Sequence, residues 1–287
     1  MKEIEKFIEY LKYEKRFSNH TSINYEKDLT DFIEFQNKKV EDIEINDIRK
    51  YLKHLYDKKY SNASISRKVS TLKSFFKYLE AENYIKINPM ILISNPKKDK
   101  KLPSFLNYND IEKLLNTPDL KTHDGKRDAL IIEMLYSTGV RVSELVNIEI
   151  KDINTKDQSI IILGKGNKER YAYYGTKCKD LLELYLSDIK TDSPYLFTNK
   201  HGNKLNDRIV RTIITNNAKK AGLKIKVTPH TLRHTYATHM LNEGADLKSV
   251  SDLLGHENLS TTQIYTHVSN ERLRNIYLNS HPRAKKH

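Results

Sequence analysis

Residues 159–174, SIIILGKGNKERYAYY, interrupt a chain whose periodicity is otherwise mostly helical. Residues 159–163 are a short run rich in isoleucine, and residues 164–168, GKGNK, contain two glycines. Residues 169–174 form a second strand-like run, which is rich in tyrosine. Two such runs joined by a short segment that contains glycine predict a β-hairpin. The chain is therefore expected to contain a small sheet among helices.

The segments around this hairpin form a mixed α/β region that starts at Asn107. NYNDIEKLL and KRDALIIEMLYSTG are helical patterns, and the second ends at Gly139, a residue type that commonly ends helices. Further helices are predicted at about 176–189 and 206–220, and again from Pro229 onward. The patterns predict a mainly α fold with one small β-hairpin.

The first ninety residues carry helical periodicity only, with apolar residues three or four positions apart. Asn46 is a candidate cap for the helix INDIRKYLKHLY, and Ser61 or Asn62 is a candidate start for the longer helix that follows. These patterns predict a compact bundle of four or five helices over residues 1–94.

Basic residues exceed acidic residues, 50 against 37, which gives a formal net charge of +13. Such a surplus is typical of proteins that bind a polyanion, most often nucleic acid; a solvated lysine-rich surface is the alternative. In the N-terminal bundle, Arg67, Lys68, Lys73 and Lys77 are expected near one face. That face is a candidate phosphate contact, and a plain solvated face is the alternative.

Residues 95–104 contain prolines and a cluster of lysines that break both helix and strand periodicity. They are interpreted as a basic linker between two domains. Its lysines, which are candidates to follow a phosphate backbone, are Lys97, Lys98, Lys100 and Lys101.

The single cysteine, Cys178, lies in the helical pattern TKCKDLLELYL and is interpreted as a bystander. One cysteine allows no intrachain disulfide, which fits a reducing compartment. Acidic residues interrupt the apolar positions of the first seventeen residues, so these indicate an amphipathic helix and not a signal peptide. No apolar run approaches membrane-spanning length. We expect a cytoplasmic protein that does not bind membranes.

Two short motifs place a cation beside glycine. In TGVRVSEL (138–145), Arg141 follows Gly139, and Glu144 is three residues further on, where it can hold a partner. A surface ion pair is the alternative. In Gly164-Lys165-Gly166, the lysine is expected at the hairpin tip, where glycines allow close approach to a ligand. A generic lysine in a tight turn is the alternative.

The segment PHTLRHTYATH (229–239) places His230 and Arg233 on one helix face. His234 is four residues after His230, a spacing that also suits a metal pair. A His-Glu-x-x-His zinc motif has glutamate after its first histidine, whereas this chain has threonine there and an arginine within the turn. A metal site is therefore unfavourable, and His234 and His239 are interpreted as structural.

The last such motif, GHENLSTTQIYTH (255–267), carries His256 nine residues before Tyr265. On its own it fits a surface turn and a helix capped by Ser260. The full order Arg141, Lys165, His230-x-x-Arg233, His256, Tyr265 nevertheless resembles the tyrosine recombinases, the phage integrase and Xer family. The likeness rests on TGVRVSEL, GKGNKER, PHTLRHTYATHML and LLGHENLSTTQIYTHV, and it covers about residues 105–280.

The resemblance is nearest to short, two-domain Xer-type members. It implies a SAM-like core-binding domain over residues 1–94 and an α/β catalytic domain over residues 105–287. It further implies that Tyr265 attacks a DNA phosphodiester to form a 3′-phosphotyrosyl link and a free 5′-hydroxyl. Arg141 and Arg233 would then clamp the nonbridging oxygens.

The same resemblance assigns the remaining roles. Lys165 would protonate the leaving 5′-oxygen, His230 would act as acid or base toward the tyrosine, and His256 would hydrogen-bond the phosphate. Glu144 would orient its neighbours. The covalent link conserves the bond energy for rejoining, so no metal, nucleotide or other cofactor is expected.

The implied partners are double-stranded DNA with a specific recombination site and further copies of the chain in a cyclic tetramer. The helix after Asn270 is expected to dock in trans on a neighbouring protomer, with packing on its own domain as the alternative; its apolar residues are Leu273, Ile276, Tyr277 and Leu278. A partner recombinase or activator, the target sequence and the biological role stay open. A type IB topoisomerase and an inactive DNA-binding protein are the alternative functions.

Overall fold

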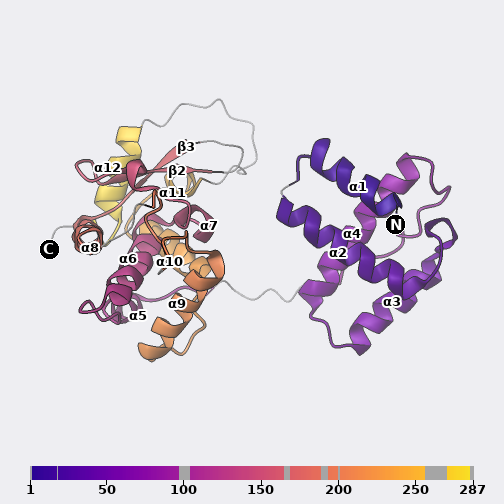
Figure 1. The fold of residues 1–287 in the computed structure, drawn as a ribbon, viewed down its shortest axis with the longest axis horizontal. Coiled ribbons are helices and arrows are strands. Elements are labelled where there is room, and N and C mark those ends of the chain that lie inside the picture. Colours follow the sequence, from indigo (N-terminus) through magenta and orange to yellow (C-terminus); the bar gives the residue numbers. More distant parts are fainter. Residues whose placement is uncertain are drawn as a thin grey trace. The chain divides into compact units, whose positions relative to one another are not determined.

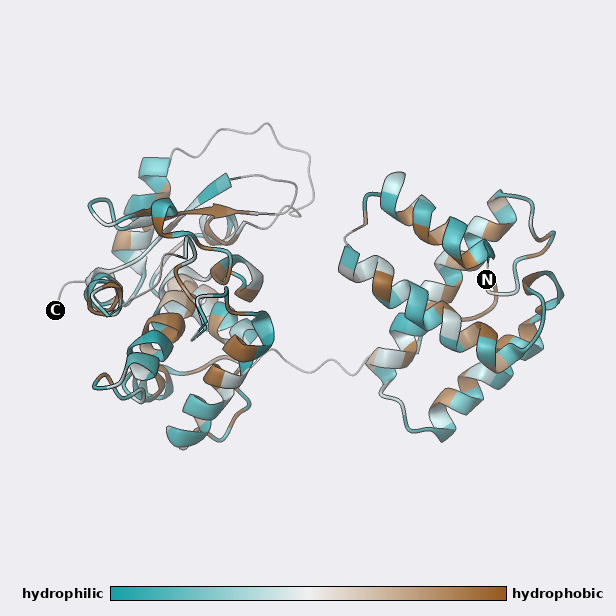
Figure 2. Cartoon of the chain, viewed as in Figure 1, coloured by the Kyte–Doolittle hydropathy of each residue, from teal (hydrophilic) through white to brown (hydrophobic). Residues whose placement is uncertain are grey.

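The computed structural model describes residues 2–17, 19–96, 104–164, 169–188, 193–199, 201–255 and 270–284. The chain divides into two compact units, residues 1–101 and 102–287 (Figure 1). Each unit has its own apolar core. Hydrophobic and hydrophilic residues alternate around most helices (Figure 2), as expected for helices that cover a core with one face. Nowhere in the described part of the chain is a helix long and apolar enough to cross a bilayer.

Unit 1 is a bundle of helices. Its elements are α1 (Lys2–Tyr13), α2 (Asn19–Gln36), the 3-10 helix η1 (Val40–Asp42), α3 (Ile45–Asp57) and α4 (Asn62–Ala81). The predicted cap at Asn46 is wrong, because α3 begins one residue earlier and the Asp47 carboxylate accepts a hydrogen bond from the backbone N–H of Glu44 at 3.1 Å. The predicted cap at Ser61 is confirmed, because its hydroxyl accepts from the N–H of Ser64 at 3.2 Å.

Unit 2 is built around α6 (His123–Thr138), whose residues 129–138 are all buried. The helices of unit 2 that pack against α6 are α5 (Tyr108–Leu115), α7 (Val142–Leu145), α8 (Thr176–Leu186), α9 (Asp207–Lys220) and α10 (Pro229–Asn242). A helix covered on all sides is expected to be apolar all round, which explains the run ALIIEML apart from Glu133, whose charge is paired with Arg283. The chain leaves α6 through Gly139 in the left-handed region, at φ 62°.

A three-stranded antiparallel sheet lies beside these helices. Its strands are β1 (Ile153–Asn154), β2 (Ser159–Leu163) and β3 (Glu169–Tyr173), in the order β1-β2-β3. The predicted hairpin is confirmed as β2 and β3. Strand β1 is a finding of the structure, because two residues are too short to show a period of two. Ile162 lies opposite Arg170, and Ile162 is buried against the core.

The C-terminal helix α12 (Asn270–Ser280) packs against α10, α11 (Leu247–Leu254) and β3 of its own unit. Tyr277 is fully buried, and its ring stacks on His281 with a centroid distance of 5.1 Å. In the single chain this helix packs on its own unit, with Leu273 and Ile276 partly buried and Leu278 exposed. Docking in trans within an assembly stays a prediction. Arg283 then holds the buried carboxylate of Glu133 at 2.6 Å.

We predict that Arg283→Met destabilises unit 2 by roughly 3–5 kcal/mol, because it leaves the Glu133 carboxylate buried without its counter-charge. Urea unfolding of the full chain, followed by circular dichroism, measures the loss. The double variant Arg283→Met with Glu133→Leu is the matched control and should recover most of it. If the single variant is as stable as the parent, the ion pair does not anchor the tail.

Candidate active site

Arg141 occupies the turn between α6 and α7, two residues after Gly139. Its backbone N–H donates to Glu144 Oε2 at 2.7 Å, and its Nη1 donates to Glu144 Oε1 at 2.8 Å. One carboxylate therefore fixes both the main chain and the guanidinium of this arginine. The Arg141 side chain keeps 38% of its surface exposed, so it can also meet a ligand.

Arg170 on β3 is a site residue that sequence reasoning missed. Its Nη1 and Nη2 donate to the two oxygens of Glu144 at 3.1 and 2.8 Å. The carboxylate of Glu144 thus lies between two guanidinium groups. The signal that could have found Arg170 is its register, since it pairs with Ile162 on the buried face of the sheet, where an arginine needs a partner.

The two arginines keep the buried Glu144 ionised. Burial of this carboxyl raises its pKa, but the hydrogen bonds and charge of Arg170 and the hydrogen bonds from Arg141 outweigh that effect. The net result is a pKa of Glu144 below its usual range. The group is therefore an anion at neutral pH.

Arg233 on α10 lies deeper, with 8% of its surface exposed. Its Nη1 donates to the carbonyl of Gly139 and its Nη2 to the carbonyl of Leu254, both at 2.6 Å. Burial lowers the pKa of Arg233 to about 10, and the charge of Arg141 acts in the same direction. The guanidinium nevertheless stays charged at neutral pH.

The three arginines converge on the C-terminal end of α11. Arg170 Nε donates to the carbonyl of Leu253 at 3.3 Å, Arg233 to Leu254, and Arg141 Nη2 to Gly255 at 3.2 Å. The last carbonyls of a helix lack partners within it and carry partial negative charge, so they attract cations. Guanidinium groups also suit the oxygens of a phosphate, and the partly exposed Arg141 can reach one. The arrangement can therefore hold a phosphodiester.

The structure brings Arg141, Glu144 and Arg233 together; spacing indicated the pair of Arg141 and Glu144, and the family resemblance implied the addition of Arg233. His230 is the second residue of α10 and is exposed, three residues before Arg233 on the same helix. The other predicted members of the site, Lys165, His256 and Tyr265, lie outside the described residues.

The interpretation of His239 as structural is confirmed. The side chain is buried, its Nδ1 is 2.9 Å from the Tyr136 hydroxyl, and its ring stacks on Tyr108 with centroids 4.1 Å apart. His234 lies edge-on to Phe105, with ring centroids 6.1 Å apart. Cys178 is buried, and burial raises the pKa of its thiol well above the usual value, so it is no nucleophile.

The predicted phosphate contact at Lys68 is wrong. Its side chain is only 4% exposed, and its ammonium lies 3.0 Å from Asp28 and 2.8 Å from Asp31. Arg67 also pairs with Asp28, although it keeps 47% of its side-chain surface exposed.

The other predicted phosphate contacts of the N-terminal part fall into two groups. Lys73 is half-buried and Lys77 is exposed, so both keep access to a ligand. The linker lysines lie outside the described residues; these are Lys97, Lys98, Lys100 and Lys101.

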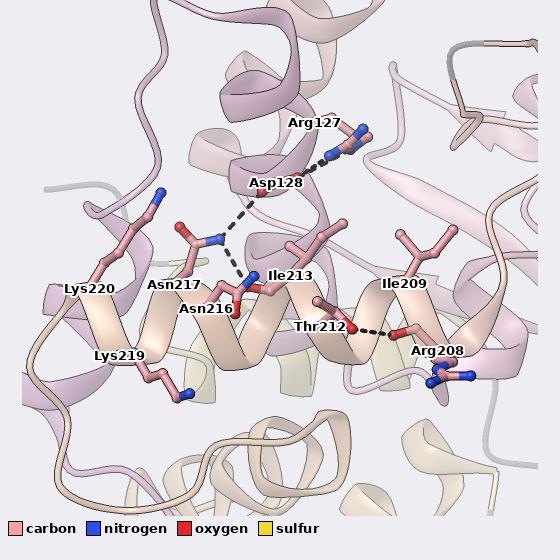
Figure 3. A pocket seen from close by; sticks show the side chains of 10 residues that line it. All are labelled: Arg127, Asp128, Arg208, Ile209, Thr212, Ile213, Asn216, Asn217, Lys219 and Lys220. Carbon is pink, nitrogen blue, oxygen red and sulfur yellow. Dashed lines mark hydrogen bonds and ion pairs between the residues drawn. The ribbon is translucent and has the colours of Figure 1, made fainter.

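A second basic surface, which sequence reasoning also missed, covers α9. Figure 3 shows a hollow along this helix, with Arg208 toward its first turn and Lys219 and Lys220 toward its last. Thr212 and Asn216 lie between these cations. Cations with hydroxyl and amide groups between them suit a nucleic acid, because they can contact phosphates and base edges.

Comparison with known proteins gives one consistent family. Residues 104–272 match the model of the phage integrase family, and residues 4–83 match the phage integrase N-terminal SAM-like domain. Tyrosine recombinase XerC of Anoxybacillus flavithermus is 46% identical over 97% of both chains.

Solved structures agree with this result. The crystal structure of XerA recombinase is similar, with 31% identity, a TM-score of 0.51 and coverage of 99% of this chain and 100% of that one. A lambda integrase(75–356) dimer bound to a COC′ core site has the same fold, with a TM-score of 0.74 at 20% identity over 93% of this chain and 98% of that one.

We predict that Glu144→Gln lowers the melting temperature of unit 2 by roughly 6–12 °C, because three cations lose their shared counter-charge. Sulfate should raise the melting temperature of this variant more than that of the parent, because a bound anion replaces the missing charge. Thermal melts across a sulfate series measure both effects, with the exposed Glu183→Gln as control. Equal sulfate responses in variant and parent would contradict the assignment of an anion site.

Proposed function

The chain belongs to the phage integrase family of tyrosine recombinases, and we propose that it is an Xer-like site-specific DNA recombinase that works through a 3′-phosphotyrosyl intermediate. The observation that carries this proposal is the cluster of Arg141, Arg233 and Glu144. Its guanidinium groups lie close together, so they can bind the nonbridging oxygens of one scissile phosphate.

In the proposed cleavage step, the Tyr265 oxygen attacks phosphorus while the bond from phosphorus to the 5′-oxygen breaks. His230 takes the phenol proton and Lys165 gives a proton to the leaving 5′-oxygen. Negative charge that gathers on the nonbridging oxygens is stabilised by Arg141 and Arg233.

The arginines suit this task because their guanidinium groups are held in position before the substrate binds. Arg233 is held by two backbone carbonyls and Arg141 by Glu144, so little reorganisation is needed in the transition state. His256 would add a hydrogen bond to the phosphate. Attack of the freed 5′-hydroxyl on the phosphotyrosine reverses the step, so neither nucleotide nor metal is required by the bond changes.

Family membership supports double-stranded DNA as the partner and a homo-oligomer on that DNA; we propose a cyclic tetramer, working in the cytoplasm. In this assembly α12 would dock in trans, which requires that Tyr277 and Arg283 leave the groove they occupy in the single chain. A weaker alternative is a type IB topoisomerase, which would need no second duplex. Likeness to a XerC over 97% of the chain favours the recombinase.

We predict that Tyr265→Phe binds DNA as the parent does but forms no covalent adduct, because only the attacking hydroxyl is lost. Arg141→Ala and Arg233→Ala should each cut slower by roughly 100-fold or more, by analogy with loss of one oxyanion donor. A suicide substrate resolved on a denaturing gel measures the adduct. An adduct retained by Tyr265→Phe would refute the assignment of the nucleophile. Pairing of two duplexes by the protein would separate a recombinase from a topoisomerase, which needs only one.

We also propose that the exposed basic face of α9 contacts DNA. Arg211 is exposed and lines a hollow with Arg208, and both would contact phosphates or bases. Arg211→Gln should weaken binding and lower the slope of log affinity against log salt by about 1, because one fewer counterion is released. Fluorescence anisotropy over a salt series measures the slope. Lys113→Gln, an exposed lysine of α5, is the control, and equal slopes in both variants would remove α9 from the interface.

A further inference from the structure

We propose that Arg170 is a positioning residue of the cleavage reaction, which holds Glu144, and through it Arg141, together with the end of α11. The inference rests on the proposed function, since it assigns a role within that reaction. Its basis is that every nitrogen of the Arg170 guanidinium points at the protein. Nη1 and Nη2 bind Glu144, and Nε binds the carbonyl of Leu253.

Arg170 is also less open to a ligand than Arg141. Its side chain is 14% exposed, against 38% for Arg141. Arg170 already gives three of its five N–H groups to a carboxylate and a carbonyl of the protein. Arg170 is therefore expected to act on the reaction through its partners and not by touching DNA.

The first partner is Glu144. Arg141 binds the two oxygens of Glu144 through its backbone N–H and Nη1, and the fork of Arg170 on β3 adds a second hydrogen bond to each oxygen. Arg170 also shares the negative charge of Glu144. The three arginines and one glutamate carry a formal net charge of +2, and loss of Arg170 would halve it. The phosphate would then meet an Arg141 that is both less fixed and more strongly neutralised.

The second partner is the end of α11. Arg170 binds the carbonyl of Leu253, and its side chain lies against Gly255, where an added Cβ would be 3.0 Å from Arg170 Cδ. Gly255 itself has φ 66°, a conformation that favours glycine. The side chain of Arg170 thus sets where α11 ends, beside the carbonyls that Arg233 and Arg141 also bind.

The test compares Arg170→Met and Arg170→Lys in the parent chain and in Arg141→Ala. Single-turnover cleavage of a saturating suicide substrate gives the rate. Fluorescence anisotropy, measured on variants that also carry Tyr265→Phe and so do not cut, gives the DNA affinity. Thermal melts give the stability. Arg170→Met should cut slower by roughly 10- to 100-fold, as expected when a reacting group is displaced by about 1 Å. Its DNA affinity should stay within about twofold, because the side chain faces the protein.

The double variant decides between positioning and general structural damage. If Arg170 acts through Arg141, adding Arg170→Met to Arg141→Ala should lower the cleavage rate by less than about threefold, because the effects of coupled residues are not additive. Arg170→Lys keeps the charge but not the fork, so its rate should fall between parent and Arg170→Met. It also keeps most of the packing, and it carries the comparison if Arg170→Met does not fold.

Three outcomes would overturn the inference. The first is a parent-like rate in both Arg170 variants, and the second is a loss of equal size with and without Arg141. The third is a loss that appears only as weaker DNA binding. A parent chain that forms no adduct would instead overturn the proposed function, and the role of Arg170 with it.

Discussion

The carboxylate of Glu144 is the counter-charge on which the arrangement of unit 2 depends. Arg141, Arg170 and Arg233 lie close enough to repel one another, and in a partly buried site that repulsion is weakly screened. A single anion held by the fork of Arg170 and by Nη1 and the backbone N–H of Arg141 offsets this repulsion while leaving the cluster cationic. This is the balance a phosphate site needs, because full neutralisation would remove the attraction for the ligand.

The scaffold brings these residues together from four elements. The buried helix α6 fixes the turn at Gly139, from which Arg141 starts, and α10 packs against α6 and carries Arg233. Strand β3 brings in Arg170, and α11 supplies the carbonyls that all three arginines bind. Helical patterns indicate α6, α10 and α11 one by one, but they do not indicate how these helices meet β3. The site therefore exists only once the core of unit 2 is packed.

Local signals in the sequence were sufficient for most elements and for part of the site. Apolar periodicity predicted the helices, the hairpin followed from its glycine-containing turn, and spacing alone paired Arg141 with Glu144. The contribution of Arg170 depends on a pairing across the fold, and the α11 carbonyls are main-chain atoms without any sequence signature. The prediction for Lys68 was wrong for the same reason. Its acidic partners lie on α2, which is separated from the helix of Lys68 by α3 in the sequence. Tertiary packing decided each of these cases.

The position of α12 has a consequence for how the protein is made. Tyr277 joins the same apolar cluster as Leu253 and Leu254, and Arg283 neutralises Glu133 in α6. Both Tyr277 and Arg283 follow all of unit 1 along the chain. Domains fold largely as units during synthesis, so unit 1 can be complete while unit 2 still lacks its final helix. The apolar cluster that contains Leu253 and Leu254, whose carbonyls bind Arg170 and Arg233, is therefore completed only after unit 1.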